Sequence, residues 1–73
     1  MMPFKSWDDV LAFVRARGEL WYHAPLDILP HIVRVVRIFK NGKIRIAPWT
    51  RDCDPFTADN GHLDRMRHKQ VSL

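Results

Sequence analysis

The sequence predicts one small α+β domain, in which an amphipathic N-terminal helix packs on an antiparallel sheet of three to four strands. Two observations predict it: an apolar stripe at helical spacing near the start, and Asn41-Gly42 between two runs rich in β-branched residues. So short a chain, of 73 residues, has room for one modest core. We therefore treat 1–73 as a single domain, with 1–5 and 70–73 frayed.

Residues 6–17 have the pattern of a helix. Their apolar side chains recur three and four residues apart and share one face: Trp7, Val10, Leu11 and Val14. Ser6 stands where the first helical N–H groups need an acceptor, and Gly18 can adopt the left-handed conformation that ends a helix. The capping serine, the apolar face and the terminal glycine together predict one helix.

The segment after the helix predicts a strand and a connection. Glu19–Ala24 is rich in aromatic residues and stops at a proline, which favours a strand. Residues 25–30 begin and end with proline and connect this strand to the next. We expect the two leucines and the isoleucine of this connection to pack back onto the core.

Residues 31–47 have the pattern of a β-hairpin. Basic residues at every third position of His31–Lys40 would share one side of a helix. However, six of the nine residues from Ile32 to Lys40 are Val, Ile or Phe, which favour a strand. Asn41-Gly42 is a turn signal, and charged and apolar residues alternate strictly over 43–46. The hairpin is therefore preferred to the helix.

A two-residue turn at Asn41-Gly42 sets the register, because it pairs Lys40 with Lys43. One face then turns to the core and contains a single charge: Val33, Val35, Arg37, Phe39, Ile44 and Ile46. The other face mixes cations with apolar groups: Arg34, Val36, Ile38, Lys40, Lys43, Arg45 and Trp49. Arg37 on the core face indicates a β-bulge that shifts the register, a guanidinium that emerges at the rim, or a ligand-binding arginine.

The C-terminal third offers two structures. Phe56 either opens a short final strand or anchors a last helical turn. In the helical version Asp59 or Asn60 caps the turn, and Leu63 and Met66 share a face. A partial small β-barrel with a short C-terminal helical turn fits this plan.

Positive charge is concentrated on the predicted hairpin. The chain has 12 Lys and Arg against 8 Asp and Glu, for a formal net charge of +4. Between Asp27 and Asp52 no residue is acidic and six are basic: Arg34, Arg37, Lys40, Lys43, Arg45 and Arg51. Such asymmetry favours an anionic partner. Cations interleaved with apolar and aromatic groups on a sheet bind phosphates and stack on bases, so nucleic acid is one candidate.

The candidate binding residues are the basic residues of the hairpin region and the tryptophan beside them: Arg34, Lys40, Lys43, Arg45, Trp49 and Arg51. The competing interpretation is a solvated sheet face whose cations discourage aggregation. An exposed Trp49 beside arginines also fits a hot spot for an acidic protein surface. A homodimer is another use of such a face, since domains this small often gain stability by self-association.

Cysteine and histidine usage argues against a metal site or an enzyme. The single cysteine, Cys53, forms no internal disulfide, which favours a reducing, cytoplasmic setting. Cys53, His62 and His68 lack the spacing that holds a tetrahedral zinc ion. A Cys/His nucleophile pair would need an enclosed pocket. We expect no cofactor and no catalysis. The sequence has neither a secretory signal nor an apolar stretch near the ~20 residues of a membrane span, so we expect no membrane partner.

Three segments resemble short uncharacterised proteins of phage and prophage genomes: 20–27 (LWYHAPLD), 39–45 (FKNGKIR), and 56–65 with its FTAD and HLDR runs. The resemblance implies a small accessory protein of a mobile element, a group that includes nucleic-acid binders and inhibitors of host machinery. The strand order is also similar to that of small Src-homology-type barrels. That fold needs five strands, and only three are clear in the sequence.

Overall fold

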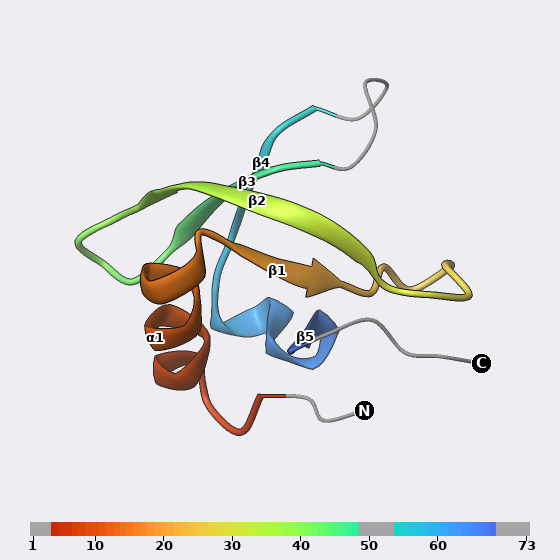
Figure 1. Cartoon of the computed structure of the whole chain (residues 1–73), viewed down its shortest axis with the longest axis horizontal. Helices are drawn as coiled ribbons and strands as arrows, with labels where there is room; N and C mark the ends of the chain where they lie inside the picture. The colour runs from red at the N-terminus through yellow and green to blue at the C-terminus, as the bar shows by residue number, and fades with distance from the viewer. Residues whose placement is uncertain (1–3, 49–53, 69–73) are drawn as a thin grey trace.

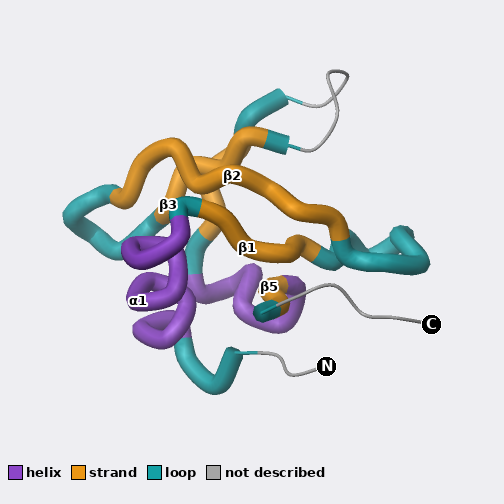
Figure 2. Tube along the Cα trace, viewed as in Figure 1, coloured by secondary structure: helices purple, strands orange, loops and turns teal. Residues whose placement is uncertain are grey.

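The protein folds as one helix on a curled five-stranded antiparallel sheet (Figure 1), in a computed structural model that describes residues 4–48 and 54–68. Its elements are α1 (Trp7–Arg17), β1 (Glu19–Tyr22), β2 (His31–Ile38), β3 (Ile44–Ala47), β4 (Phe56–Ala58), the 3-10 helix η1 (Asn60–Arg65) and β5 (Met66–Arg67). The strand order is β4-β3-β2-β1-β5, so the last strand returns to pair with the first. The α+β class and the partial barrel are confirmed, with five strands instead of three to four. Figure 2 shows helix, strands and loops separately.

Helix α1 begins and ends at the predicted signals. The Ser6 hydroxyl accepts a hydrogen bond from the Asp9 backbone N–H at 3.3 Å. At the other end Gly18 has φ 75°, and its N–H donates to the Val14 carbonyl at 2.7 Å. Three members of the predicted stripe are buried, namely Val10, Leu11 and Val14. Side-chain capping and a left-handed glycine therefore set the length of the helix.

The core lies between α1 and the concave side of the sheet. Strand residues that alternate inward supply most of it: Leu20, Tyr22, Val33, Ile44, Ile46, Ala58 and Met66. Full burial of one such aliphatic side chain stabilises the fold by about 1.5–3 kcal/mol. Phe4, which the sequence placed in a frayed start, is 5% exposed, and its ring stacks on His68 with centroids 3.9 Å apart.

The hairpin turn has three residues, so the predicted pairing of Lys40 with Lys43 is wrong. The Phe39 N–H donates to the Lys43 carbonyl at 2.8 Å, and the Gly42 N–H donates to the Phe39 carbonyl at 3.0 Å. Gly42 has φ 86°, which is the left-handed conformation that closes a three-residue hairpin loop. The Asn41 side chain also accepts from the Lys43 N–H at 3.1 Å. These bonds stabilise the longer loop over the two-residue turn.

A register shift at Val36 turns Arg37 outward. Strands β2 and β3 pair in one register up to Val35 and in another from Arg37, so Val36 is an extra residue in β2. Beyond this bulge Ile38 packs against the core and Arg37 is exposed. The bulge interpretation is therefore confirmed. The placement of Arg37 on the core face and of Ile38 on the outer face is wrong.

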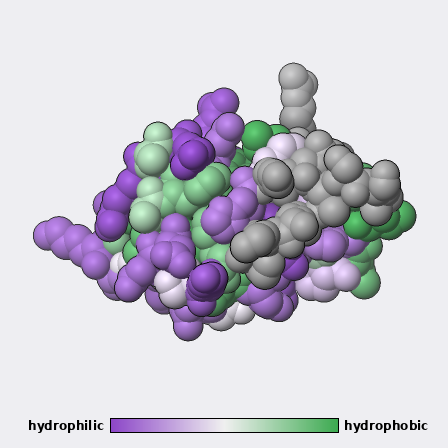
Figure 3. Space-filling view, turned by 60° about the horizontal axis from the view of Figure 1, so that its bottom comes forward, coloured by the Kyte–Doolittle hydropathy of each residue, from purple (hydrophilic) through white to green (hydrophobic). Residues whose placement is uncertain are grey.

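The connection between β1 and β2 does not pack back onto the core as expected. Leu26 is 97% exposed and Ile28 is 83% exposed. The connection turns at Asp27, whose N–H donates to the Ala24 carbonyl at 3.0 Å. The Asp27 side chain points inward, toward His31, and its two apolar neighbours are left outside. Figure 3 shows hydrophobic atoms at this end of the molecule, away from the hairpin turn.

Both alternatives for the C-terminal third occur, in succession. Phe56 opens β4, and Asp59 then caps η1 with an Oδ1 that accepts from the Gly61 N–H at 2.9 Å. Strand β5 follows and pairs with β1, which places Met66 opposite Tyr22. In the part of the chain that the structure describes, no helix is long and apolar enough to cross a membrane.

Candidate functional site

The outer face is the side of the sheet turned away from α1. Cross-strand pairing sets three rows of side chains across it: Arg67, Trp21 and Ile32; then Glu19, Arg34 and Ala47; then Arg37, Arg45 and Thr57. Two of its apolar side chains are left in solvent, since Ile32 is 42% exposed and the bulged Val36 is 55% exposed. A shallow recess between the first two rows is lined by Ile32, Arg34, Val36 and Ala47 among others. The face thus mixes cations with apolar contact surface.

Arg37 and Arg45 lie directly opposite each other on β2 and β3. The guanidinium carbon of Arg37 is 4.9 Å from the centre of the Phe39 ring. Arg45 donates from Nη1 to the Thr57 hydroxyl at 3.1 Å. Each guanidinium is therefore positioned by an uncharged neighbour. Phe39, predicted in the core, instead lies half-buried beneath Arg37.

No carboxylate of residues 4–48 and 54–68 forms an ion pair with Arg37 or Arg45. In the described residues, every ion pair within 4.0 Å joins an aspartate to a histidine, as in Asp27 with His31 and Asp59 with His62. Like charges directly opposite on neighbouring strands destabilise a sheet. The opposed arginines are an arrangement that folding alone does not favour.

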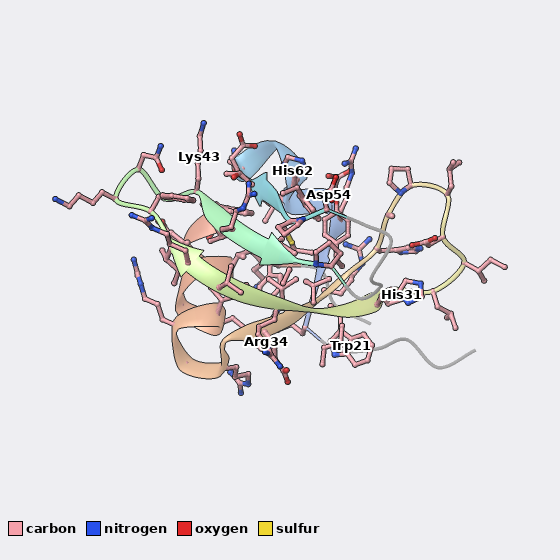
Figure 4. The ribbon with its side chains drawn as sticks, turned by 90° about the horizontal axis from the view of Figure 1, so that it is seen from above. Trp21, His31, Arg34, Lys43, Asp54 and His62 are labelled. Atoms are coloured by element: carbon pink, nitrogen blue, oxygen red, sulfur yellow. The ribbon has the colours of Figure 1, made fainter. Side chains whose placement is uncertain are left out.

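The structure divides the predicted site residues between two sides of the molecule. Arg34 lies on the outer face with Arg45, next to Trp21 (Figure 4). Lys43 points to the side of β4 and η1, where its charge helps to lower the pKa of Asp59. Lys40 is exposed within the hairpin turn. Trp49 and Arg51 lie outside the described residues.

The pKa of Asp59 is held below its ordinary value, chiefly because the Gly61 backbone N–H donates to the carboxylate. A hydrogen bond and charge from His62, and the more distant Lys43, act in the same direction. This aspartate caps η1 and is not part of the outer face.

The register prediction missed Arg37, which it placed toward the core. The sequence did indicate that Arg37 was misplaced, because it was the one charged residue on a face assigned to the core. A bulge removes this conflict, since it shifts the register and turns the arginine outward. The candidate residues chosen from the sequence also include Trp49 and not Trp21. Trp21 is the aromatic residue that the described sheet places between Arg67 and Ile32.

The arrangement supports non-covalent binding of an anion. Within residues 4–48 and 54–68, no cluster of three or more His, Cys, Asp or Glu side chains could hold a metal ion. Cys53, weighed above as a ligand or nucleophile, lies outside these ranges. Comparisons of the chain with protein-family models, with curated proteins and with solved structures find no match.

Proposed function

We propose that the protein is a small non-enzymatic binding module whose outer face contacts the phosphate backbone of nucleic acid. The observation that carries the proposal is the opposed pair of Arg37 and Arg45, which no described carboxylate neutralises. A phosphate between them would replace their repulsion with attraction. Guanidinium groups suit this role, because their planar donors match phosphate oxygens in bidentate geometry.

The pair is held on two hydrogen-bonded strands. Arg37 lies over Phe39 and Arg45 is hydrogen-bonded to Thr57, so both side chains lose less conformational freedom on binding. Arg34, in the neighbouring row, adds a third cation along β2, opposite Glu19 on β1. The excess of basic residues from 28 to 51 would also attract a polyanion over a longer range.

Apolar groups on the same face support nucleic acid over a simple inorganic anion. Ile32, Val36 and the half-buried Trp21 offer surface on which bases or sugars can pack while arginines hold the backbone. An acidic protein surface is the alternative partner for the same face. Either use fits a cytoplasmic accessory protein of a mobile element, which the sequence resemblance implies.

Fluorescence anisotropy with labelled single-stranded DNA, RNA and duplex DNA at low salt tests the proposal. Arg37→Gln/Arg45→Gln should weaken binding by about tenfold or more, since 1.4 kcal/mol of lost contact energy corresponds to tenfold. The matched control, Arg15→Gln/Arg17→Gln, removes the same charge from α1 and should bind nearly as wild type. No binding by the wild-type protein would refute the proposal. Equal losses in the two variants would show that net charge alone acts.

Polyglutamate provides the test of the alternative. If it displaces the nucleic acid at equal concentrations of charge, the face recognises acidic polymers in general and an acidic protein becomes the favoured partner. Nucleic-acid binding predicts weak displacement, because polyglutamate offers neither phosphates nor bases.

A further inference from the structure

The loop between β1 and β2, residues 23–30, presents two aliphatic side chains to solvent. Leu26 and Ile28 are the most exposed large hydrophobic residues in the described chain, at 97% and 83%. The loop projects from the sheet at the end opposite the hairpin turn (Figure 1), so it is distant from the opposed arginines. It adjoins the outer face at the row of Arg67, Trp21 and Ile32 and lies away from the arginine pair proposed to bind phosphate.

The loop is held in shape by its own polar groups. His23 donates from Nε2 to the Asp27 carbonyl at 2.8 Å, and the Asp27 N–H donates to the Ala24 carbonyl at 3.0 Å. The Asp27 Oδ2 atom is excluded from solvent and lies 3.6 Å from His31 Nε2. The only acidic residue of the loop thus turns one of its carboxylate oxygens inward.

This orientation is the reverse of what solubility favours. A surface loop usually exposes its polar side chains, and here one carboxylate oxygen of the aspartate is shielded from solvent while the leucine and isoleucine on either side of it are in water. Because the loop is braced, the two aliphatic groups are preorganised and would lose little freedom on entering a pocket. The exposed Ile32 at the start of β2 continues the apolar surface toward the outer face.

The surroundings of the loop indicate the charge of its partner. A recess beside it is lined by His23, Pro25, Asp64, Arg65 and Arg67, among others. Arg65 donates to the Tyr22 hydroxyl, and Arg67 donates to backbone carbonyls, so neither guanidinium pairs with a described carboxylate. The recess thus places two arginines against one aspartate, a formal net charge of +1 with histidine counted as neutral.

Two other occupants fit less well. A second copy of this chain carries the same net charge of +4 and the same positive recess, so the two loops would repel. A lipid bilayer would gain only one leucine and one isoleucine side chain, which together have fewer apolar carbons than a myristoyl chain, and a single myristoyl chain binds membranes only marginally.

We propose that the β1–β2 loop docks, through Leu26 and Ile28, into an apolar groove rimmed by carboxylates on another protein. Both aliphatic side chains would enter the groove together, and Arg65 and Arg67 would face its acidic rim. This interface lies at the other end of the sheet from Arg37 and Arg45 and shares only Arg67 and Ile32 with the outer face. One molecule can therefore join a protein partner at one end and nucleic acid at the arginine pair.

Selection from a displayed random-peptide library tests the proposal, with wild-type protein as bait and Leu26→Ser/Ile28→Ser as counter-bait. The expected peptides combine apolar residues with Asp or Glu. Synthesised, they should lose about tenfold affinity or more for Ile28→Ser, because burying one such side chain is worth at least that factor. Ala16→Ser, at an exposed apolar position on α1, should bind as wild type.

Three results would overturn the proposal. Peptides that bind the double variant as well as wild type would exclude the loop as the anchor. A dimer seen by analytical ultracentrifugation and lost in the double variant would assign the loop to self-association. Loop-dependent sedimentation with phosphatidylglycerol/phosphatidylcholine vesicles would assign it to a lipid surface. Circular dichroism of all three serine variants should match wild type, since the substituted side chains are exposed.

Discussion

The indole Nε1 of Trp7 donates a hydrogen bond to the Gly42 carbonyl oxygen at 2.5 Å, across 35 residues of sequence. This bond joins α1 to the hairpin turn. Trp7→Phe keeps an aromatic ring and removes the donor, so it should lower the free energy of unfolding by about 0.5–1.5 kcal/mol. Urea denaturation measures the change. Trp21→Phe, whose indole has no such bond to a described residue, is the control, and equal losses in both variants would contradict the account.

Gly42 is expected to resist substitution because of its backbone. A Cβ there would meet Leu11 Cδ1 at 3.8 Å and Trp7 Nε1 at 3.9 Å, which are ordinary contacts. The φ of 86° is the difficulty, since a left-handed conformation costs an alanine about 1–2 kcal/mol. Gly42→Ala should lose that much stability in thermal or urea unfolding, and Gly42→Asn should lose less. An alanine variant as stable as wild type would show that the turn has another conformation.

Acid should weaken the cap of η1. The pKa of Asp59 is lowered in the folded protein, chiefly by the Gly61 N–H, so the unfolded chain binds this proton more readily. The stabilisation is complete above the ordinary aspartate pKa of about 3.9 and is lost as pH falls through the lower, folded value.

Asp59→Asn isolates this contribution, because the amide oxygen can still accept from Gly61 but does not titrate. The stability advantage of wild type over the variant should shrink as the pH falls into that acid range. Urea unfolding of both proteins at a series of pH values measures it. A constant difference would mean that the carboxylate is not stabilised by folding.

Arg45→Glu should separate stability from binding. It places a carboxylate opposite Arg37, and an opposite-charge cross-strand pair contributes about 0.2–1 kcal/mol where the like-charged pair opposes folding. The free energy of unfolding should therefore rise at low salt while nucleic-acid binding falls. The gain should shrink in high salt because the pair is near the surface. A loss of stability would indicate that the arginine pair is structural.

Local signals were sufficient for α1 and for the existence of the hairpin. Ser6 and Gly18 act on the residues next to them, so capping is visible in the sequence. The Asn41-Gly42 signal does not distinguish a two-residue from a three-residue loop, because a left-handed glycine serves both. The Trp7 indole, which lies far away in the sequence, adds a hydrogen bond to the Gly42 carbonyl that no local pattern reveals.

The bulge and the short edge strands needed tertiary contacts. The shift at Val36 allows Ile38 to reach the core and Arg37 to leave it, a gain that no single segment reveals. Strands β4 and β5 are 3 and 2 residues long and exist through pairing with β3 and β1. The exposure of Leu26 was missed because an inward-turned aspartate cannot be read from composition.

The salt dependence of DNA affinity tests the central claim most directly. Each phosphate contact contributes about 0.9 to the slope of log K against log salt concentration on duplex DNA. If Arg37 and Arg45 each contact a phosphate, Arg37→Gln/Arg45→Gln should reduce the magnitude of that slope by the contribution of about two contacts. Arg15→Gln/Arg17→Gln should leave the slope unchanged. Identical slopes for the wild-type protein and the outer-face variant would contradict the account.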